Sequence, residues 1–302
     1  MAQPIEQPLP TWQLVIVLWG TKYSVREVNR LIDTVREKAS QPFRPVLITD
    51  RDRPGLAEDV VVKTFPEGFI KPEMIGPGCH AKLSMFEAGV VPRDLPAVYV
   101  DIDTVVLGDL ARLLSLPKTD QAVILFQSAV IPIGKIGRFI FKITNGRKYA
   151  RGNSSIVVYH PRECGYIAEK WHEMFTRLGG IKARPMIADE RFMSWCAQEH
   201  LQRIPRDVAV KFPTEFMLPW RWLILTRASL PWVRRRWAGL LAVTLPGIEV
   251  KGDALLAMEE GTEVVDKKGR RLIWSEKAIG PMKSRLLGYY RALDAGRKET
   301  GA

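Results

Sequence analysis

Residues 97–110 read Ala-Val-Tyr-Val-Asp-Ile-Asp-Thr-Val-Val-Leu-Gly-Asp-Leu, an apolar run that carries two carboxylates one residue apart, Asp101 and Asp103. The segment from Ala97 to Val100 is too apolar for a strand with one face in water, so it predicts a central strand of a sheet. Two carboxylates at the end of such a strand repel each other unless a cation offsets their charge. This pair is the first candidate for a functional site.

The chain before this stretch alternates between strands and helices. Leu14–Trp19 is an apolar run that ends at Gly20, and Ser24 can cap a helix that continues to about Ala39. Pro45–Thr49 predicts the next strand, and Val60–Val62 a third. A strand, a helix and a strand in this order form a βαβ unit, which predicts a parallel sheet.

The same alternation continues to about residue 215. We expect helices over His80–Val91, Arg162–Leu178 and Asp189–Leu201, strands over Gln121–Phe126, Ser154–Tyr159 and Val208–Phe212, an irregular basic stretch from Ile131, and a hairpin-like turn at Asp266–Arg270. The predicted fold class is α/β, with a mixed, mostly parallel sheet flanked by helices. The predicted organisation is a mobile lead-in (1–11), an α/β core (12–215) and an irregular C-terminal extension (216–302) packed on the core.

Composition limits the classes of protein. The chain has 302 residues and 46% hydrophobic content, enough for a sizeable core, and its three cysteines predict neither a disulfide framework nor a multi-cysteine zinc site. The first residues lack the pattern of a signal peptide, and no apolar run approaches the ~20 residues that span a bilayer. We therefore expect a cytoplasmic protein, with a peripheral position at the inner face of the membrane as the alternative.

The formal net charge of +12 makes polyanions or anionic membrane surfaces plausible partners. The segment 203–236 carries eight basic and two acidic residues, and the segment 131–152 carries six basic residues and no acidic one. Nucleic-acid binding ranks low, because no recognised motif is present and the basic residues form no obvious recognition helix.

A hard divalent cation, Mn²⁺ or Mg²⁺, would offset the two carboxylates and could bridge to the phosphates of a nucleotide. Alternate residues of a strand point to the same side, so Asp101 and Asp103 could converge on one ion. The alternative is that Asp103 caps the following turn and Asp101 pairs with a basic residue.

The segment Tyr99–Leu110 resembles the metal-binding segment of the GT-A-fold glycosyltransferases, in particular glycosyltransferase family 8, which includes glycogenin and bacterial lipopolysaccharide galactosyl- and glucosyltransferases. The likeness extends in the family's order over roughly residues 12–215. It implies a single GT-A domain and transfer of a sugar from a nucleotide-sugar donor, a UDP-sugar in most of the family, with metal assistance and retention at the anomeric carbon. The implied acceptor is a glycan or a lipid-linked hydroxyl, as in polysaccharide or lipopolysaccharide biosynthesis.

The resemblance also implies residues that bind the donor. The first-strand loop would receive the base and ribose, Lys82 would contact the donor, and the Asp-x-Asp segment would hold the metal and the diphosphate; the residues concerned are Leu18, Trp19, Gly20, Tyr23, Lys82, Asp101, Ile102 and Asp103. Tyr23 could instead pack on the first helix, and Lys82 could be an ordinary solvated lysine.

Three further residues match segments that the family places at the transferred sugar: Asn153, Asp189 and Glu190. Asn153 could equally be a turn residue, and Asp189 could be only a helix N-cap. Glu190 stands where the family has a glutamine, which puts a charge in place of an amide.

The larger departure is a missing third metal ligand. The family supplies a histidine from a C-terminal His-Gly-x-x-Lys-Pro motif, whereas the last histidine here is His200. Residues 244–253 occupy roughly the right place, where Asp253 could supply an oxygen ligand and Lys251 could approach the phosphates. Because this third metal ligand is missing, the alternative is that the chain is a catalytically silent GT-A domain that acts as a binding module.

The C-terminal part carries a basic, tryptophan-rich segment. Tryptophan prefers the membrane interface, and neighbouring arginines attract anionic headgroups. A membrane contact is predicted through Trp220, Arg221, Trp222, Trp232, Arg234, Arg235, Arg236 and Trp237. The alternative is that the tryptophans are packed in the core and the arginines form a solvated rim.

Overall fold

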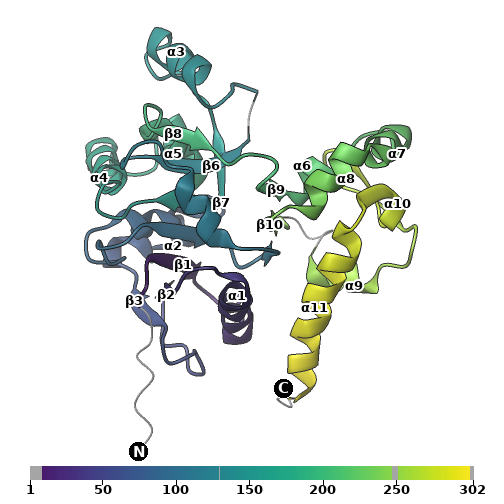
Figure 1. Ribbon diagram of the computed structural model, residues 1–302. Helices are drawn as coiled ribbons and strands as arrows, with labels where there is room; N and C mark the ends of the chain where they lie inside the picture. The colour runs from purple at the N-terminus through teal and green to yellow at the C-terminus, as the bar shows by residue number, and fades with distance from the viewer. Residues whose placement is uncertain (1–8, 129, 247–250, 300–302) are drawn as a thin grey trace, which may run out of the picture. The chain divides into compact units, whose positions relative to one another are not determined.

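The computed structural model describes residues 9–128, 130–246 and 251–299, which form two compact units (Figure 1). The first unit consists of the chain up to Ile102 together with Leu110–Ile204. The second consists of Asp103–Asp109 together with the chain from Pro205 onward. The predicted division into a nucleotide-sugar-binding core of residues 12–215 and an extension of residues 216–302 stays a prediction. The two compact units are defined by their contacts, which do not show where a ligand binds.

The first unit is built on a seven-stranded sheet with the strand order β3-β2-β1-β4-β7-β6-β8. Strand β7 is antiparallel to both of its neighbours, and the other adjacent pairs are parallel. This confirms the predicted mixed, mostly parallel sheet with a central β4. The strands are β1 (Trp12–Leu18), β2 (Phe43–Thr49), β3 (Val61–Thr64), β4 (Ala97–Val100), β6 (Val123–Gln127), β7 (Gly152–Tyr159) and β8 (Leu201–Arg203).

Helix α1 (Val25–Lys38) follows the first strand as predicted. Ser24 and Glu27 form a capping box, in which each side chain satisfies the other residue's backbone N–H. One side of the helix, with Val28, Leu31 and Val35, is buried. Local signals therefore determine both the start and the buried face of this helix.

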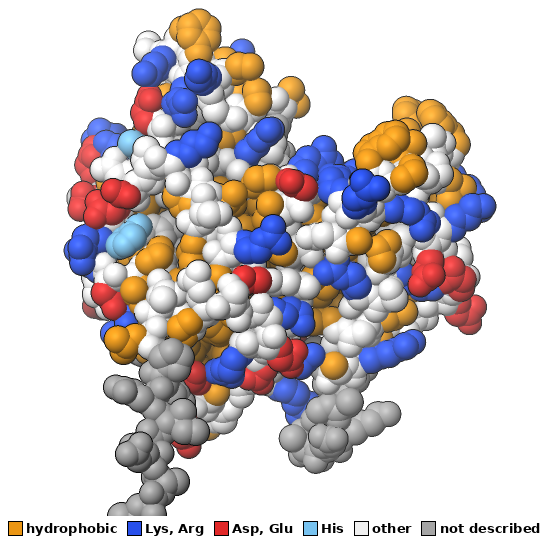
Figure 2. Space-filling view, in the orientation of Figure 1, with side chains coloured by type: hydrophobic (Ala, Val, Ile, Leu, Met, Phe, Trp, Pro, Cys, Tyr) orange, Lys and Arg blue, Asp and Glu red, His pale blue; other side chains and the backbone are white. Residues whose placement is uncertain are grey.

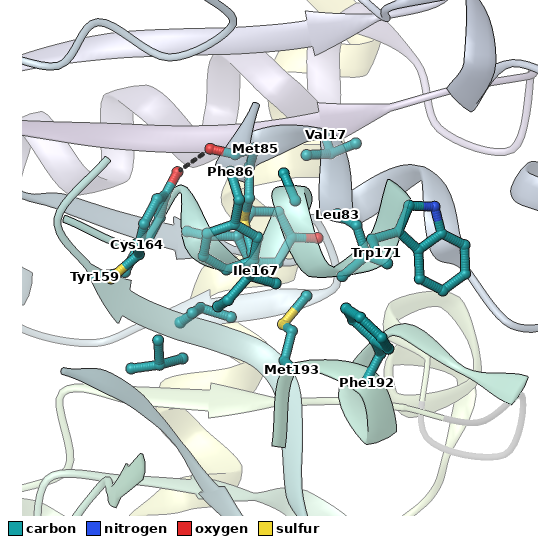
Figure 3. Close-up of a cluster of buried hydrophobic side chains, with 14 of the residues drawn as sticks. Val17, Leu83, Met85, Phe86, Tyr159, Cys164, Ile167, Trp171, Phe192 and Met193 are labelled. Atoms are coloured by element: carbon teal, nitrogen blue, oxygen red, sulfur yellow. Dashed lines mark hydrogen bonds between the residues drawn. The ribbon is translucent and has the colours of Figure 1, made fainter. Parts of the chain in front are cut away.

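One face of the sheet is covered by η2 (His80–Phe86), α4 (Tyr166–Leu178) and α5 (Asp189–Cys196). Figure 3 shows the core that they form with the sheet, where Phe86 and Trp171 meet side chains from β1 and β7. The Tyr159 hydroxyl donates to the Met85 carbonyl at 3.2 Å, so the one polar group of that ring is satisfied. This core anchors the segments that lead into the candidate site.

Two sequence predictions differ from this structure. The predicted helix over His80–Val91 is a 3₁₀-helix that ends at Phe86; every residue of it is buried, so its sequence lacks a distinct polar face. The basic stretch from Ile131, predicted to be irregular, contains helix α3 (Lys135–Ile143). The shorter elements of the first unit are η1 (Glu67–Phe69), α2 (Pro72–Ile75), η3 (Leu110–Ser115) and η4 (Arg184–Ile187).

The second unit has a core of its own and is more regular than the predicted extension. It contains the sheet β5-β10-β9 and the hairpin β11-β12, whose turn lies at Asp266–Arg270 as predicted. Its elements are β5 (Thr104–Val106), β9 (Ala209–Lys211), α6 (Phe212–Phe216), α7 (Arg221–Ser229), α8 (Pro231–Ala238), β10 (Ala242–Thr244), α9 (Gly252–Ala257), β11 (Glu263–Val265), β12 (Arg271–Ile273), α10 (Glu276–Ile279) and α11 (Met282–Glu299). Among the described residues of the chain, no helix is both long and apolar enough to cross a membrane.

Candidate functional site

The sheet brings the end of β4 beside the beginning of β7. Because these strands are antiparallel, with Val100 opposite Ile156, the residues after β4 lie next to those that open β7. The Asp101 N–H extends the ladder by donating to the Ser155 carbonyl at 2.9 Å. Asp101 and Asn153 therefore lie at the same edge of the sheet, the edge at which open α/β sheets bind ligands.

Asp101 is bonded to two neighbours. Lys82 Nζ lies 2.6 Å from its Oδ1, and the Tyr99 hydroxyl donates to the same oxygen. The side chains of Lys82 and Asp101 are only 11% and 20% exposed. Lys82 is thus a buried ion-pair partner rather than a solvated lysine, and Asp101 pairs with a basic residue, as the sequence left open.

Burial and neighbouring charges shift the pKa values of Lys82 and Tyr99. Burial would lower the pKa of Lys82, but the carboxylates around it outweigh that effect and raise the pKa well above its usual value. Burial raises the pKa of Tyr99, and the charge of Asp101 raises it further. Lys82 therefore stays charged and Tyr99 stays a donor at neutral pH.

Asp189 is the first residue of α5, and its backbone N–H donates to the Gly78 carbonyl at 2.9 Å. The N-cap position is occupied by Ala188, so the N-cap interpretation of Asp189 is wrong. Its carboxylate is buried and accepts a 2.6 Å bond from the Ser154 hydroxyl. Burial raises the pKa of Asp189 to about 6, although the charge of Lys82 and the Ser154 hydrogen bond act in the opposite direction.

Asn153 lies within strand β7 rather than in a turn, which excludes its interpretation as a turn residue. Its Nδ2 donates to Glu190 Oε2 at 2.6 Å. Its Oδ1 is buried and has no hydrogen-bond partner among the described residues. A buried amide oxygen without a donor is costly, so this atom is suited to accept a hydrogen bond from a ligand.

The loop after β1 is held by an acidic residue that the sequence analysis missed. Asp50, directly after β2, accepts from the Gly20 N–H at 3.1 Å, and Arg53 binds both Asp50 and the Gly20 carbonyl. Burial opposes ionisation of Asp50, but the bonds from Arg51, Gly20 and Arg53 outweigh it and lower its pKa to about 2. Its position at the end of a strand next to β1 was the signal that could have identified it.

The remaining part of the predicted donor-binding set is Leu18, Trp19, Gly20 and Tyr23. Leu18 ends β1, and Gly20 has a left-handed backbone (φ 64°), which suits glycine at this turn. Tyr23 is half-exposed, with Lys22 Nζ 5.0 Å from its ring centre. The ring is therefore accessible, while its predicted stacking on a base stays a prediction.

The chain passes from the first unit to the second between Ile102 and Asp103. The expectation that Asp101 and Asp103 point to one side of a strand is wrong, because β4 ends at Val100 and residues 102–103 form a turn. Within the second unit, Lys251 Nζ lies 2.7 Å from Asp103 Oδ2. Each carboxylate of the pair therefore has its own lysine.

The donor set fits a hard cation in its chemistry, because both residues offer carboxylate oxygens and the bonds described for Asp101 use Oδ1. No cluster of three or more His, Cys, Asp or Glu residues suited to a metal occurs in the described ranges. The side chain of Asp253, considered above as a ligand, lies outside the described residues. Asp101 belongs to the first unit and Asp103 to the second, so their predicted binding of one ion stays a prediction.

The tryptophan-rich segment divides into an exposed and a buried part. Trp220, Trp222 and Trp232 are exposed, whereas Trp237 is buried and donates from Nε1 to Glu215 at 2.8 Å. The prediction that Trp237 takes part in a membrane contact is therefore wrong. The arginines differ as well: Arg235 is exposed, Arg221 pairs with Glu263, Arg234 donates to backbone carbonyls and Arg236 pairs with Glu215.

In the first unit, donors and acceptors are gathered at one edge of an open α/β sheet, the edge at which such sheets bind ligands. No protein-family model matches the sequence, and no curated protein matches it. Among solved structures, the chain is similar to the galactosyltransferase LgtC in complex with donor and acceptor sugar analogs, with a TM-score of 0.54, 10% identity, and coverage of 93% of this chain and 95% of that chain. The bifunctional glycosyltransferase WbbM gives a TM-score of 0.55 at 12% identity, over 97% of this chain and 52% of that chain.

The glycosyltransferase GlyE of Streptococcus pneumoniae gives a TM-score of 0.50 at 11% identity, over 95% of this chain and 64% of that chain. Likeness at such low identity establishes the fold. The protein therefore has the GT-A fold of these glycosyltransferases, which confirms the resemblance and the fold predicted from the sequence.

Proposed function

We propose that this chain is a glycosyltransferase that takes a sugar from a nucleotide-sugar donor, in the first instance a UDP-sugar. The observation that carries the proposal is the set of polar side chains that converge at one sheet edge of a GT-A fold: Lys82, Asp101, Asn153, Asp189 and Glu190. The unpartnered Asn153 Oδ1 supports a ligand at this point, because a sugar hydroxyl can donate to it.

Each residue has a role in the proposal. Asn153 and Glu190, which are already hydrogen-bonded to each other, would hold the sugar through its hydroxyls. Asp189, in its ionised form, would accept a hydrogen bond from a further sugar hydroxyl. Lys82 would offset the charge of Asp101 and supply a cation at the site. Such fixed charges and donors stabilise the charge that develops as the donor bond breaks. Retention at the anomeric carbon and transfer of a hexose are part of the proposal.

Asp101 and Asp103 would hold a divalent cation, Mn²⁺ or Mg²⁺. When bound, this ion would supply positive charge for the leaving diphosphate. Each of the two aspartates is ion-paired with a lysine, Asp101 with Lys82 and Asp103 with Lys251. The loop from Leu18 to Tyr23 would receive the base and ribose. Asp50 and Arg53 would hold the conformation of this loop through their hydrogen bonds to the Gly20 backbone.

The proposed acceptor is a glycan or a lipid-linked hydroxyl at the cytoplasmic face of a membrane. Support comes from the exposed tryptophans of the second unit, where the Trp220 and Trp222 rings stack with centroids 6.2 Å apart. Stacked, exposed indoles and the exposed Arg235 of the same unit suit a headgroup region.

The test is thermal stabilisation by a panel of nucleotide sugars, with and without Mn²⁺. UDP-sugars should raise the Tm of the wild type, and the Asp101→Asn, Asp103→Asn double variant should lose the metal-dependent part of that rise. Asp94→Asn is the matched control, because Asp94 is an ion-paired aspartate just before β4, at the other end of that strand. Equal stabilisation of the wild type and the double variant, or none, would refute the proposed site.

Turnover of the nucleotide-sugar donor distinguishes an active glycosyltransferase from a catalytically silent binding module. We expect donor hydrolysis or transfer that EDTA abolishes and Mn²⁺ restores. Donor binding without turnover under any metal condition would favour the binding module. Activity that persists in EDTA would instead favour a protein cation such as Lys82 at the diphosphate.

A further inference from the structure

Helix α3 exposes an apolar side. Ile136, Phe139 and Ile143 are 61%, 63% and 62% exposed, and their spacing places them on one side of the helix. Figure 2 shows hydrophobic side chains together with Lys and Arg over the part of the molecule where Figure 1 places α3. A helix of nine residues that leaves three large apolar side chains in water has an unpartnered face.

The opposite side of α3 attaches it to the first unit. Gly137 is buried, and a Cβ built there would lie 2.5 Å from the Pro132 carbonyl oxygen and 2.8 Å from Ala150 Cβ. The Phe141 ring packs against Trp195 of α5, with centroids 6.3 Å apart. The helix is therefore fixed by its small and aromatic side, and the apolar side is directed away from the core.

Basic residues lie on the flank between these two sides. Lys135, Arg138 and Lys142 repeat at the helical period, about 75–135° from the centre of the apolar side by the roughly 100° per residue of a helix. Arg147 and Lys148 follow at once and are exposed. Glu199 offsets one charge, because it pairs with Lys142 at 3.4 Å.

We propose that α3 is a membrane-binding element that inserts its apolar side into the interface of an anionic bilayer. A helix with an apolar face, a basic flank and no acidic residue is suited to lie in the headgroup region, with its cations on lipid phosphates. Figure 1 shows α3 at the periphery of the first unit, where its apolar side chains are exposed. The charge disfavours a second copy of the chain, because two copies would bring like charges together.

This surface differs from the tryptophan surface of the second unit, and its test does not depend on the proposed function. The full-length protein is sedimented with phosphatidylcholine vesicles and with vesicles that also contain phosphatidylglycerol. We expect binding to the anionic vesicles that weakens as salt rises. The triple variant Ile136→Ser, Phe139→Ser, Ile143→Ser should bind at least about tenfold more weakly, since each side chain loses its apolar burial.

A charge variant tests the flank. The triple variant Lys135→Glu, Arg147→Glu, Lys148→Glu should also bind anionic vesicles at least about tenfold more weakly, because each basic residue near the surface attracts lipid phosphates. The matched control is Val62→Ser, Ile70→Ser, which removes two exposed apolar side chains elsewhere in the same unit. All variants change exposed positions, so an unchanged Tm verifies that they fold.

The proposal is overturned if the wild type binds no vesicles, or if the α3 variants bind as the wild type does while Trp222→Ser, Trp232→Ser abolishes binding. A dimer in solution that the triple variant dissociates would also overturn it, because a second copy would then cover the apolar side. Donor binding without vesicles should be the same in wild type and α3 variants, which separates this test from that of the donor site.

Discussion

At the scale of single residues, the buried carboxyl of Asp189 is the most informative group. Its pKa of about 6 lies above the ordinary value of 3.8, because burial penalises the charge. The folded protein therefore holds this proton more tightly than the unfolded chain does. Stability falls as pH rises from about 4 to about 6 and is level above that range.

Asp189→Asn should remove this pH dependence. Between pH 4.5 and 7.5 the wild type should lose about 2 kcal/mol of unfolding free energy through Asp189, whereas the variant, which cannot ionise, should not. Urea unfolding of both proteins at the two pH values measures the difference, since contributions from other groups cancel. An identical pH dependence in the two proteins would contradict the raised pKa.

Asp50→Asn is the control with the opposite sign. The pKa of Asp50 is lowered to about 2, so its stabilising contribution is complete above pH 4 and is lost only at lower pH. The substitution should therefore change stability equally at pH 4.5 and pH 7.5. Its Arg53 partner links this effect to the loop after β1.

At the scale of elements, the sequence predicts best where its signal is local. The capping residue and buried side of α1, the apolar strands β1 and β4 and the turn at 266–270 were all predicted and confirmed. The predicted residues Lys82, Asp101, Asn153, Asp189 and Glu190 come together because antiparallel β7 begins beside the end of β4. Their roles stay predictions.

The failures have physical causes. The sequence of η2 lacks a polar face because all of its residues are buried, so a 3₁₀-helix could not be distinguished from an α-helix. Helix α3 was missed because its apolar side is exposed and glycines interrupt its sequence. Trp237 is buried among residues distant from it in sequence, such as Glu215 and Phe216, so no local pattern indicated its burial.

The close packing around Gly137 predicts that helix α3 is sensitive to substitution at this position. A Cβ at Gly137 would lie too close to a backbone oxygen, so Gly137→Ala should displace α3 and speed hydrogen exchange in residues 135–143. Gly68→Ala is the matched control, since a Cβ there meets nothing within 4 Å. Equal exchange in wild type and Gly137→Ala would show that α3 does not depend on this contact.

At the scale of the whole molecule, each compact unit has its own hydrophobic core. The core of the second unit includes a buried carboxylate, Glu215, whose side chain is 1% exposed. It is bound by three guanidinium groups and one indole, from Arg206, Arg227, Arg236 and Trp237. Burial and the neighbouring arginines lower the pKa of Arg227, so Glu215 is what keeps these cations together.

Glu215→Gln should therefore destabilise the second unit selectively. Removing the negative charge that these arginines share in the described structure leaves the partly buried Arg227 and Arg236 without compensation, which costs up to about 3–5 kcal/mol. Glu263→Gln is the control, because that carboxylate is more exposed and its loss should destabilise the unit far less. Hydrogen exchange should speed up in residues 205–246 and 251–292 while β1, β2 and β4 keep their protection. Faster exchange in both units together would mean that they unfold as one.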